Sequence, residues 1–283
     1  LPHPPSRAAH VVRRKACLPR AAAMWAEPTF AYNCWISRSI IMLDMSAAAA
    51  QDPSRVLPGC SPARVTADVH DGALLAREAG EALDRVKDNF GPEDCTVAFI
   101  VADEGDTRAE PFARALADRG ALRSAVLVPR TGLEVRFPFL FSPGVSFGDL
   151  PFLPNEVVPG KLFLGSRVTA GERALALLGI THVVSATERA PPVPPAVRQL
   201  HIDIVDDEGT PLGPALDLAL PFLRGALAEP QGRALVHCDR GASRSASIVA
   251  ALLMAEPALR PAGAHGARSV LAHLQAARPD VRP

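Results

Sequence analysis

A cysteine and an arginine stand six positions apart in residues 237–245, His-Cys-Asp-Arg-Gly-Ala-Ser-Arg-Ser. The apolar residues 234–236 precede this segment and the apolar run 246–254 follows it, which predicts a strand, a tight loop and a helix. Such a loop directs successive backbone N–H groups and the helix N-terminus at one point, where an anion binds. The thiol of Cys238 and the guanidinium of Arg244 suit this site to the cleavage of phosphate esters.

Cys238 is the predicted nucleophile. Helix N-termini, loop amides and a nearby guanidinium favour the thiolate, and such surroundings lower a cysteine pKa to roughly 3.5–7.5. The thiolate would attack phosphorus and form a phosphocysteine, while Arg244 would hold two phosphoryl oxygens. Gly241 lets the backbone turn close to the anion, and Ser245 can donate a hydrogen bond to the departing sulfur.

Two other interpretations of Cys238 are weaker. A lone cysteine at a strand end is usually a small buried apolar residue, but the histidine, glycine and arginine around it argue for chemistry. A metal site would need further ligands, and no second cysteine or histidine stands at ligand spacing. We therefore expect neither metal nor cofactor, and we expect His237 to orient the Cys238 backbone instead of acting as a base.

The loop resembles that of the cysteine-dependent protein phosphatases, His-Cys-x5-Arg-Ser/Thr. Residues 158–166, 178–184 and 243–254 are similar to segments of the dual-specificity branch, and the resemblance covers about residues 156–283. It implies the α/β cysteine phosphatase fold and hydrolysis of phosphotyrosine and phosphoserine or phosphothreonine. The residues that would bind the phosphate are Asp239, Arg240, Gly241, Ala242, Ser243 and Arg244.

In this family an aspartate upstream of the cysteine protonates the leaving hydroxyl. Residues 200–205 alternate like a strand and run into an acidic turn, in which Asp206 lies 32 positions before Cys238. We assign Asp206 as the general acid, with Asp207 as second choice and Asp203 as a structural residue. A merely solvated acidic turn is the alternative.

The chain departs from the family pattern in three places. Asp239 and Arg240 stand where the family usually has a neutral or basic residue and a small one. We expect both side chains to point outward, with Asp239 weakening substrate binding and Arg240 offsetting part of that effect. Family members also continue beyond a segment like 278–283 into one more helix, so the phosphatase domain is expected to be truncated at its C-terminus.

Strand and helix patterns alternate in the first half of the chain. Residues 96–102 form a continuous apolar run rich in β-branched residues, as a buried parallel strand does. Further strands are expected at 40–43 and 125–128, and helices at 72–86 and 108–119. This alternation predicts a parallel α/β sheet.

Residues 31–142 resemble the rhodanese-like domain that precedes the catalytic domain in many MAP kinase phosphatases. A sulfur-transferring rhodanese needs a cysteine five positions before Arg108, and Asp103 occupies that place. A carboxylate cannot carry sulfane sulfur, so the domain is expected to be degenerate and catalytically silent. The arginine cluster that docks kinases is not evident either, because only Arg55 and Arg64 stand here, well apart.

Residues 1–30 are expected to form a disordered basic leader, and residues 143–155 a linker rich in proline and glycine. Residues 1–26 hold five basic side chains, at Arg7, Arg13, Arg14, Lys15 and Arg20, and no acid before Glu27. This pattern resembles a mitochondrial transit peptide. Sequence that is not translated, ahead of Met24, is the alternative that we favour.

Composition narrows the partners and the compartment. Formal net charge is zero and aromatic residues make up 5%, which argues against nucleic acid or an anionic membrane as partner. No apolar run approaches the roughly 18 residues of a membrane span. The five cysteines are scattered without C-x-x-C pairs, which suits a reducing compartment and favours the cytoplasm: Cys17, Cys34, Cys60, Cys95 and Cys238.

Two functions remain open. The degenerate rhodanese-like half and residues 156–161 are most similar to the serine/threonine/tyrosine-interacting-like pseudophosphatases, which lack the nucleophilic cysteine and bind phosphoproteins. This chain keeps Cys238, Arg244 and Asp206. We therefore favour an active dual-specificity phosphatase acting on phosphorylated proteins, MAP kinases among the candidates, over a phosphoprotein-binding scaffold with weak or no turnover.

Overall fold

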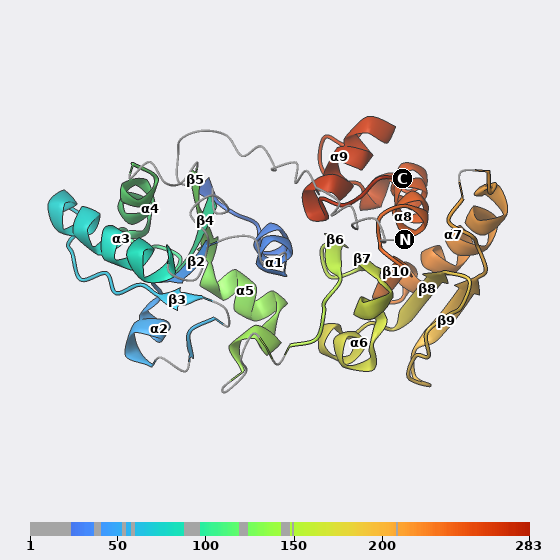
Figure 1. The fold of residues 1–283 in the computed structure, drawn as a ribbon, viewed down its shortest axis with the longest axis horizontal. Helices are drawn as coiled ribbons and strands as arrows, with labels where there is room; N and C mark the ends of the chain where they lie inside the picture. Colours follow the sequence, from blue (N-terminus) through green and yellow to red (C-terminus); the bar gives the residue numbers. More distant parts are fainter. Residues whose placement is uncertain are drawn as a thin grey trace, which may run out of the picture.

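The computed structural model describes residues 24–36, 41–52, 55–57, 60–87, 97–118, 124–142, 148, 150–207 and 209–283. Within these residues, two five-stranded sheets stand beside each other, the first built from β1–β5 and the second from β6–β10 (Figure 1). Helices connect the strands in both halves, so the α/β class expected from the sequence is present in both. Residues 1–23 of the expected leader lie outside the described part of the chain.

The N-terminal sheet is parallel throughout, with the strand order β1-β5-β4-β2-β3. Alternate residues of β4 face opposite layers: Ala98 and Ile100 pack toward α3 and α4, whereas Phe99 and Val101 pack toward α1 and α5. The elements are β1 (Met24–Trp25), α1 (Pro28–Ile36), β2 (Ile41–Asp44), α2 (Ala47–Gln51), β3 (Ser61–Pro62), α3 (Gly72–Lys87), β4 (Val97–Ala102), α4 (Ala109–Asp118), β5 (Ser124–Pro129), α5 (Arg130–Arg136) and the 3-10 helix η2 (Pro138–Phe141).

This domain begins earlier than the sequence suggested. β1 pairs with β5 and α1 is packed into the core, so residues 24–30 are part of the domain and not of a leader. Tyr32 and Trp35 of α1 are buried, and the Tyr32 ring stacks on Phe137 at a centroid distance of 4.1 Å. The expected leader was drawn too long because α1 is short and has no clear amphipathic period.

The C-terminal sheet has the order β6-β7-β10-β8-β9, with β6 antiparallel to β7 and the other pairs parallel. α7, α8 and α9 cover one face, and α6 packs on the other. The elements are β6 (Asn155–Val158), β7 (Leu162–Ser166), the 3-10 helix η4 (Arg167–Ala170), α6 (Glu172–Leu178), β8 (His182–Ala186), β9 (Arg198–Ile202), α7 (Gly213–Ala228), β10 (Ala234–Cys238), α8 (Arg244–Ala255), the 3-10 helix η5 (Pro257–Leu259) and α9 (Ala267–Ala277).

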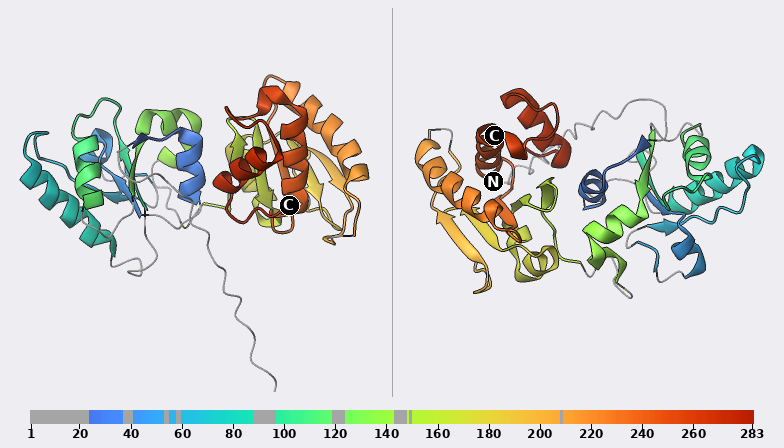
Figure 2. Two further views of the ribbon diagram at one scale, coloured as in Figure 1. Left: turned by 90° about the horizontal axis from the view of Figure 1, so that it is seen from above. Right: turned by 180° about the vertical axis from the view of Figure 1, so that it is seen from behind.

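The two domains meet through α1, which lies between the N-terminal sheet and the C-terminal domain in all views (Figures 1 and 2). One apolar cluster joins both domains, from Tyr32 and Trp35 to Phe163 and Leu175. The expected linker takes part in this packing, because Leu153 is buried and Asn155 already belongs to β6. The connection is therefore a packed interface at these residues and not a free tether.

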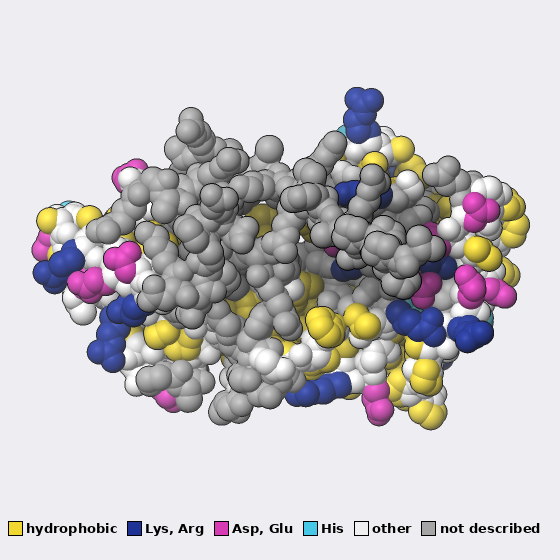
Figure 3. All heavy atoms as spheres, viewed as in Figure 1, with side chains coloured by type: hydrophobic (Ala, Val, Ile, Leu, Met, Phe, Trp, Pro, Cys, Tyr) yellow, Lys and Arg dark blue, Asp and Glu magenta, His cyan; other side chains and the backbone are white. Residues whose placement is uncertain are grey.

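Charged side chains of both signs are spread over the face shown in Figure 3, in keeping with the formal net charge of zero. Among the residues described, no helix combines the length and apolar character that crossing a bilayer requires.

Candidate active site

Cys238 ends the central strand β10, and α8 begins six residues later at Arg244. We call residues 238–244 the Cys238 loop. It lies at the carboxyl edge of the parallel strands, where open α/β sheets bind their ligands. Gly241 allows its turn: its φ is +73°, and a Cβ there would approach the Gly165 carbonyl oxygen at 2.4 Å. Any other residue at this position would have to displace the backbone of β7.

The Cys238 side chain is buried and surrounded by donors. The Gly241 N–H donates to Sγ at an N–S distance of 3.1 Å, and the Ser245 hydroxyl donates at 3.2 Å. Burial by itself would raise the pKa of Cys238. The hydrogen bonds from the Ser245 side chain and from the backbone of Ser245, Gly241 and Ala242 outweigh burial, so the pKa lies below its ordinary value.

His237 is a neutral residue beneath the loop. Its Nε2 lies 2.8 Å from the Ser185 hydroxyl, and its Nδ1 lies 3.4 Å from the Cys238 carbonyl oxygen. Burial lowers the pKa of His237 to about 4. A neutral imidazole held in this way matches the expectation that His237 orients the Cys238 backbone and does not act as a base.

Arg244 is buried and has one unsatisfied donor. Its Nη1 donates to the Ile204 carbonyl oxygen at 2.9 Å, and its Nη2 donates to Asp239 Oδ2 at 2.8 Å. Its Nε is the single buried side-chain nitrogen or oxygen without a hydrogen bond among the described residues. A buried N–H normally has a partner, and this Nε makes only an ion pair, with the Asp206 carboxylate, so it can still donate a hydrogen bond to a ligand oxygen.

Of the upstream acids, Asp206 is the one that lies against this guanidinium. Its Oδ1 is 3.4 Å from Arg244 Nε, and 51% of its side chain is exposed. Asp203 and Asp207 are exposed too, and the contacts found for Asp207 are local to its turn. The turn after β9 thus brings Asp206 to the Cys238 loop at the same edge of the sheet.

Asp239 differs from the expectation that it points outward. Its carboxylate pairs with Arg244 at 2.8 Å and with Arg167 Nη1 at 3.3 Å. Burial opposes the charge of Asp239, but the hydrogen bonds from Arg244 and Arg167 prevail and lower its pKa. Attraction to two guanidinium groups turns the side chain back over the loop. Arg240 is exposed as expected, and Arg167, which the sequence did not single out, balances the Asp239 charge.

Replacing Asp239 by asparagine is expected to tighten the binding of inorganic phosphate about fivefold, because a unit charge at a partly exposed site contributes about 1 kcal/mol. A phosphate oxygen must displace the Asp239 carboxylate from Arg244 Nη2, and the variant removes that competitor. Competitive inhibition constants for phosphate measure the effect, with Asp217→Asn on the exposed face of α7 as the charge-matched control. Weaker binding by Asp239→Asn would show that Asp239 instead holds Arg244 in place.

The corresponding loop of the N-terminal domain has a different chemistry. Asp103 follows β4, and its carboxylate accepts a hydrogen bond from the Ala47 N–H at 2.6 Å. Arg108 is engaged by Asp106 and by the Val65 carbonyl oxygen. Both side chains therefore form hydrogen bonds within the N-terminal domain.

The C-terminal domain is similar to known protein phosphatases. Residues 162–282 match the dual specificity phosphatase catalytic domain. Dual specificity protein phosphatase 26 of Bos taurus is 40% identical over 107 residues, which cover 35% of this chain and 50% of that protein. The human dual specificity protein phosphatase 13B is 41% identical over 110 residues, covering 35% and 54%. This chain thus spans about half the length of these relatives.

One solved structure is also similar to part of this chain. It is that of the human tyrosine phosphatase-like serine/threonine/tyrosine-interacting protein, with 28% identity, a TM-score of 0.40, and coverage of 45% of this chain and 85% of that one.

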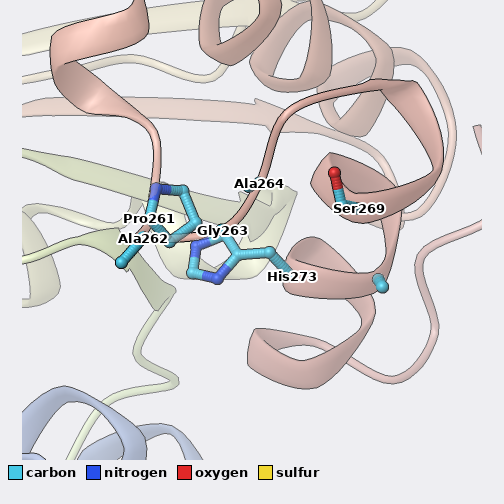
Figure 4. A pocket seen from close by; sticks show the side chains of 7 residues that line it. Pro261, Ala262, Gly263, Ala264, Ser269 and His273 are labelled. Atoms are coloured by element: carbon cyan, nitrogen blue, oxygen red, sulfur yellow. The ribbon is translucent and has the colours of Figure 1, made fainter.

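A hollow near α9 lies apart from the Cys238 loop. It is lined by residues 261–264 and by side chains of α9 such as Ser269 and His273 (Figure 4). The His273 Nε2 lies 2.9 Å from the Val157 carbonyl oxygen, so this imidazole serves the packing of α9 on β6. The described residues include no group of three His, Cys, Asp or Glu side chains that could hold a metal ion.

Proposed function

We propose that the C-terminal domain hydrolyses phosphotyrosine and phosphoserine or phosphothreonine in proteins through a phosphocysteine intermediate. The observation that carries this proposal is the Cys238 sulfur, hydrogen-bonded by Gly241 and Ser245, at one end of a loop whose other end holds the unsatisfied Nε of Arg244. A stabilised thiolate and a guanidinium N–H without a hydrogen bond on one anion-binding loop suit the transfer of a phosphoryl group.

The chemistry proceeds in two steps. The Cys238 sulfur attacks phosphorus, the bond from phosphorus to the ester oxygen breaks, and Asp206 gives its proton to that oxygen. Water then attacks the phosphocysteine, the Asp206 carboxylate accepts a proton from the water, and the sulfur departs as a thiolate that Ser245 stabilises. Arg244 and the amides of residues 239–243 hold the equatorial oxygens in both transition states.

A phosphoprotein-binding scaffold with weak or no turnover is the second candidate. Asp239 favours it, because its carboxylate already occupies Nη2 of Arg244 and must be displaced before the guanidinium can grip a phosphate with two donors. The similarity to a phosphatase-like serine/threonine/tyrosine-interacting protein is compatible with either function.

For residues 24–141 we propose a rhodanese-like domain without sulfur transferase activity. Its five-stranded parallel sheet with helices on both faces supports the resemblance. Asp103 stands in place of the cysteine that would carry sulfur, and its carboxylate accepts a hydrogen bond from the Ala47 N–H. The domain is thus suited to a structural role. The candidate partners of the whole chain are phosphorylated proteins, MAP kinases included, although the arginine cluster that docks kinases is not evident in this domain. A cytoplasmic location would keep Cys238 reduced.

The decisive experiment is to mix the full-length protein with a radiolabelled phosphotyrosine peptide and quench with acid. The proposal predicts label on the peptide that contains Cys238, formed and lost at the rate of phosphate release. The same assay with a phosphothreonine peptide tests dual specificity. A protein that binds both peptides yet gives neither labelled Cys238 nor free phosphate would be a scaffold.

A further inference from the structure

One arginine that is distant in the sequence donates hydrogen bonds to backbone carbonyls of the Cys238 loop. Arg278, just after α9, donates from Nε to the Gly241 carbonyl oxygen at 2.9 Å and from Nη2 to the Arg240 carbonyl oxygen at 2.8 Å. Its third nitrogen, Nη1, donates to Asn155 Oδ1 at 2.9 Å. We propose that Arg278 is a positioning residue that sets the thiolate reactivity of Cys238, and that Asn155 braces it from the domain interface.

The geometry of the peptide group explains how this works. In a trans peptide the C=O of one residue and the N–H of the next point in opposite directions. Arg278 holds the C=O of Arg240, so the N–H of Gly241 points the other way, at Cys238 Sγ 3.1 Å away. Its hold on the C=O of Gly241 directs the N–H of Ala242 inward in the same way. These two N–H groups are among those that lower the pKa of Cys238.

A neighbouring contact extends the same arrangement by one residue. The backbone N–H of Arg282 donates to the Ala242 carbonyl oxygen at 2.8 Å, so the segment after α9 holds three consecutive carbonyls of the loop. Arg278 is also electrostatically coupled to the nucleophile. Burial lowers its pKa, while Asp280 and the Cys238 charge oppose that effect. The guanidinium and the thiolate therefore favour each other's charged form.

Asn155, which accepts a hydrogen bond from Arg278, is connected through its neighbour Glu156 to the N-terminal domain. Asn155 is buried in β6, where its Nδ2 donates to the Ala277 carbonyl oxygen at 2.7 Å. The next residue, Glu156, is clamped by Asn33 of α1: its N–H donates to Asn33 Oδ1 at 2.8 Å and its C=O accepts from Nδ2 at 2.7 Å. A displacement of α1 would thus move the backbone next to Asn155 and alter the hydrogen bond between Asn155 and Arg278.

The carboxylate of Glu156 strengthens this clamp. It is buried, and it accepts hydrogen bonds from Thr29 of α1, from Arg136 of α5 and from the Gly160 N–H. The Tyr32 hydroxyl adds a hydrogen bond to the Pro154 carbonyl oxygen at 3.0 Å. Residues 154–156 are therefore held by the N-terminal domain on one side and hold Arg278 on the other.

The test measures the rate at which iodoacetamide alkylates Cys238 as a function of pH, followed by mass spectrometry of the peptide that contains it. Arg278→Met in the full-length protein is expected to raise the Cys238 pKa by about one unit, which slows alkylation about tenfold below the wild-type pKa. Arg278→Lys should recover part of the loss. Arg282→Met is the matched control, because its backbone contact survives, and its profile should equal that of the wild type.

The same assay tests the support that Asn155 and α1 give to Arg278. Asn155→Ala and Asn33→Ala should each slow the alkylation of Cys238 about two- to threefold. Thr66→Ala, which removes the hydrogen bond from the Thr66 hydroxyl to Glu78 inside the N-terminal domain, should leave the rate unchanged. An unaltered profile in folded Arg278→Met would refute the positioning role. If that variant does not fold, Arg278→Lys and Asn155→Ala decide by the same criterion. An unaltered profile in Asn33→Ala alone would refute the link to the N-terminal domain.

This inference concerns the same loop as the proposed phosphatase function. The effect of Arg278 on Cys238 does not depend on that function, but its consequence for catalysis does. Alkylation of Cys238 needs no turnover. If Arg278→Met shifts the alkylation profile but the wild-type protein releases no phosphate, the role of Arg278 holds and the enzymatic activity is rejected. If the wild-type protein releases phosphate but the profile does not shift, the activity holds and the role of Arg278 is rejected.

Discussion

Replacing Cys238 by serine is expected to abolish hydrolysis of a phosphotyrosine peptide, by about four orders of magnitude or more. The loop stabilises a negative charge on sulfur through the Gly241 N–H and the Ser245 hydroxyl. A serine hydroxyl in the same place stays protonated at neutral pH, and His237 is not positioned as a base that could activate it. Release of phosphate by the two proteins under identical conditions measures the loss.

The same substitution should preserve the binding site. The side chain is 2% exposed and of nearly the same size as serine, so the loop and α8 keep their packing. Loss of the thiolate also removes repulsion against the phosphate dianion. Peptide binding measured by calorimetry should therefore be unchanged or tighter, while Cys60→Ser in the N-terminal domain changes neither rate nor binding. Turnover that survives in Cys238→Ser would refute the phosphocysteine mechanism.

The strand, loop and helix around Cys238 could be predicted because the information is local. The first apolar run forms β10, and the apolar run after the loop forms α8. Between them, Gly241 allows the positive φ that the turn needs. The resemblance to the phosphatase family also points to Asp206, which follows β9 at the edge where the Cys238 loop lies and contacts Arg244. Its role as the general acid stays a prediction. The family match over residues 162–282 agrees with the resemblance to the dual-specificity phosphatases.

Contacts between distant segments could not be predicted. Neither Arg167 nor Arg278 has a spacing signal that links it to the loop, and each acts through the fold: Arg167 because it follows β7, the neighbour of β10, and Arg278 because α9 returns the chain to the loop. The orientation of Asp239 was misjudged for the same reason, since it depends on Arg167. The resemblance of residues 31–142 to a rhodanese-like domain remains a proposal that the parallel sheet supports.

Asp206→Asn is expected to lower the rate on a phosphothreonine peptide by about 10²–10⁴-fold, the usual contribution of a general acid. The alkoxide that leaves threonine is a poor leaving group and depends on protonation, whereas a nitrophenolate does not. The loss should therefore be much smaller with nitrophenyl phosphate. An asparagine keeps the size of the side chain and cannot give up a proton to the ester oxygen.

The neighbouring acid provides the control for this assignment. Asp207→Asn removes the same charge from the same turn, but Asp206 is the residue whose carboxylate lies 3.4 Å from Arg244 Nε. Only Asp206→Asn should show the large loss, the dependence on the leaving group, and the disappearance of the pH–rate limb that reports a protonated acid. If Asp207→Asn shows them instead, the turn moves on substrate binding and Asp207 is the acid. If both variants lose equally and without dependence on the leaving group, the two carboxylates act through the charge of Arg244, because the loss of a proton donor would have distinguished between substrates.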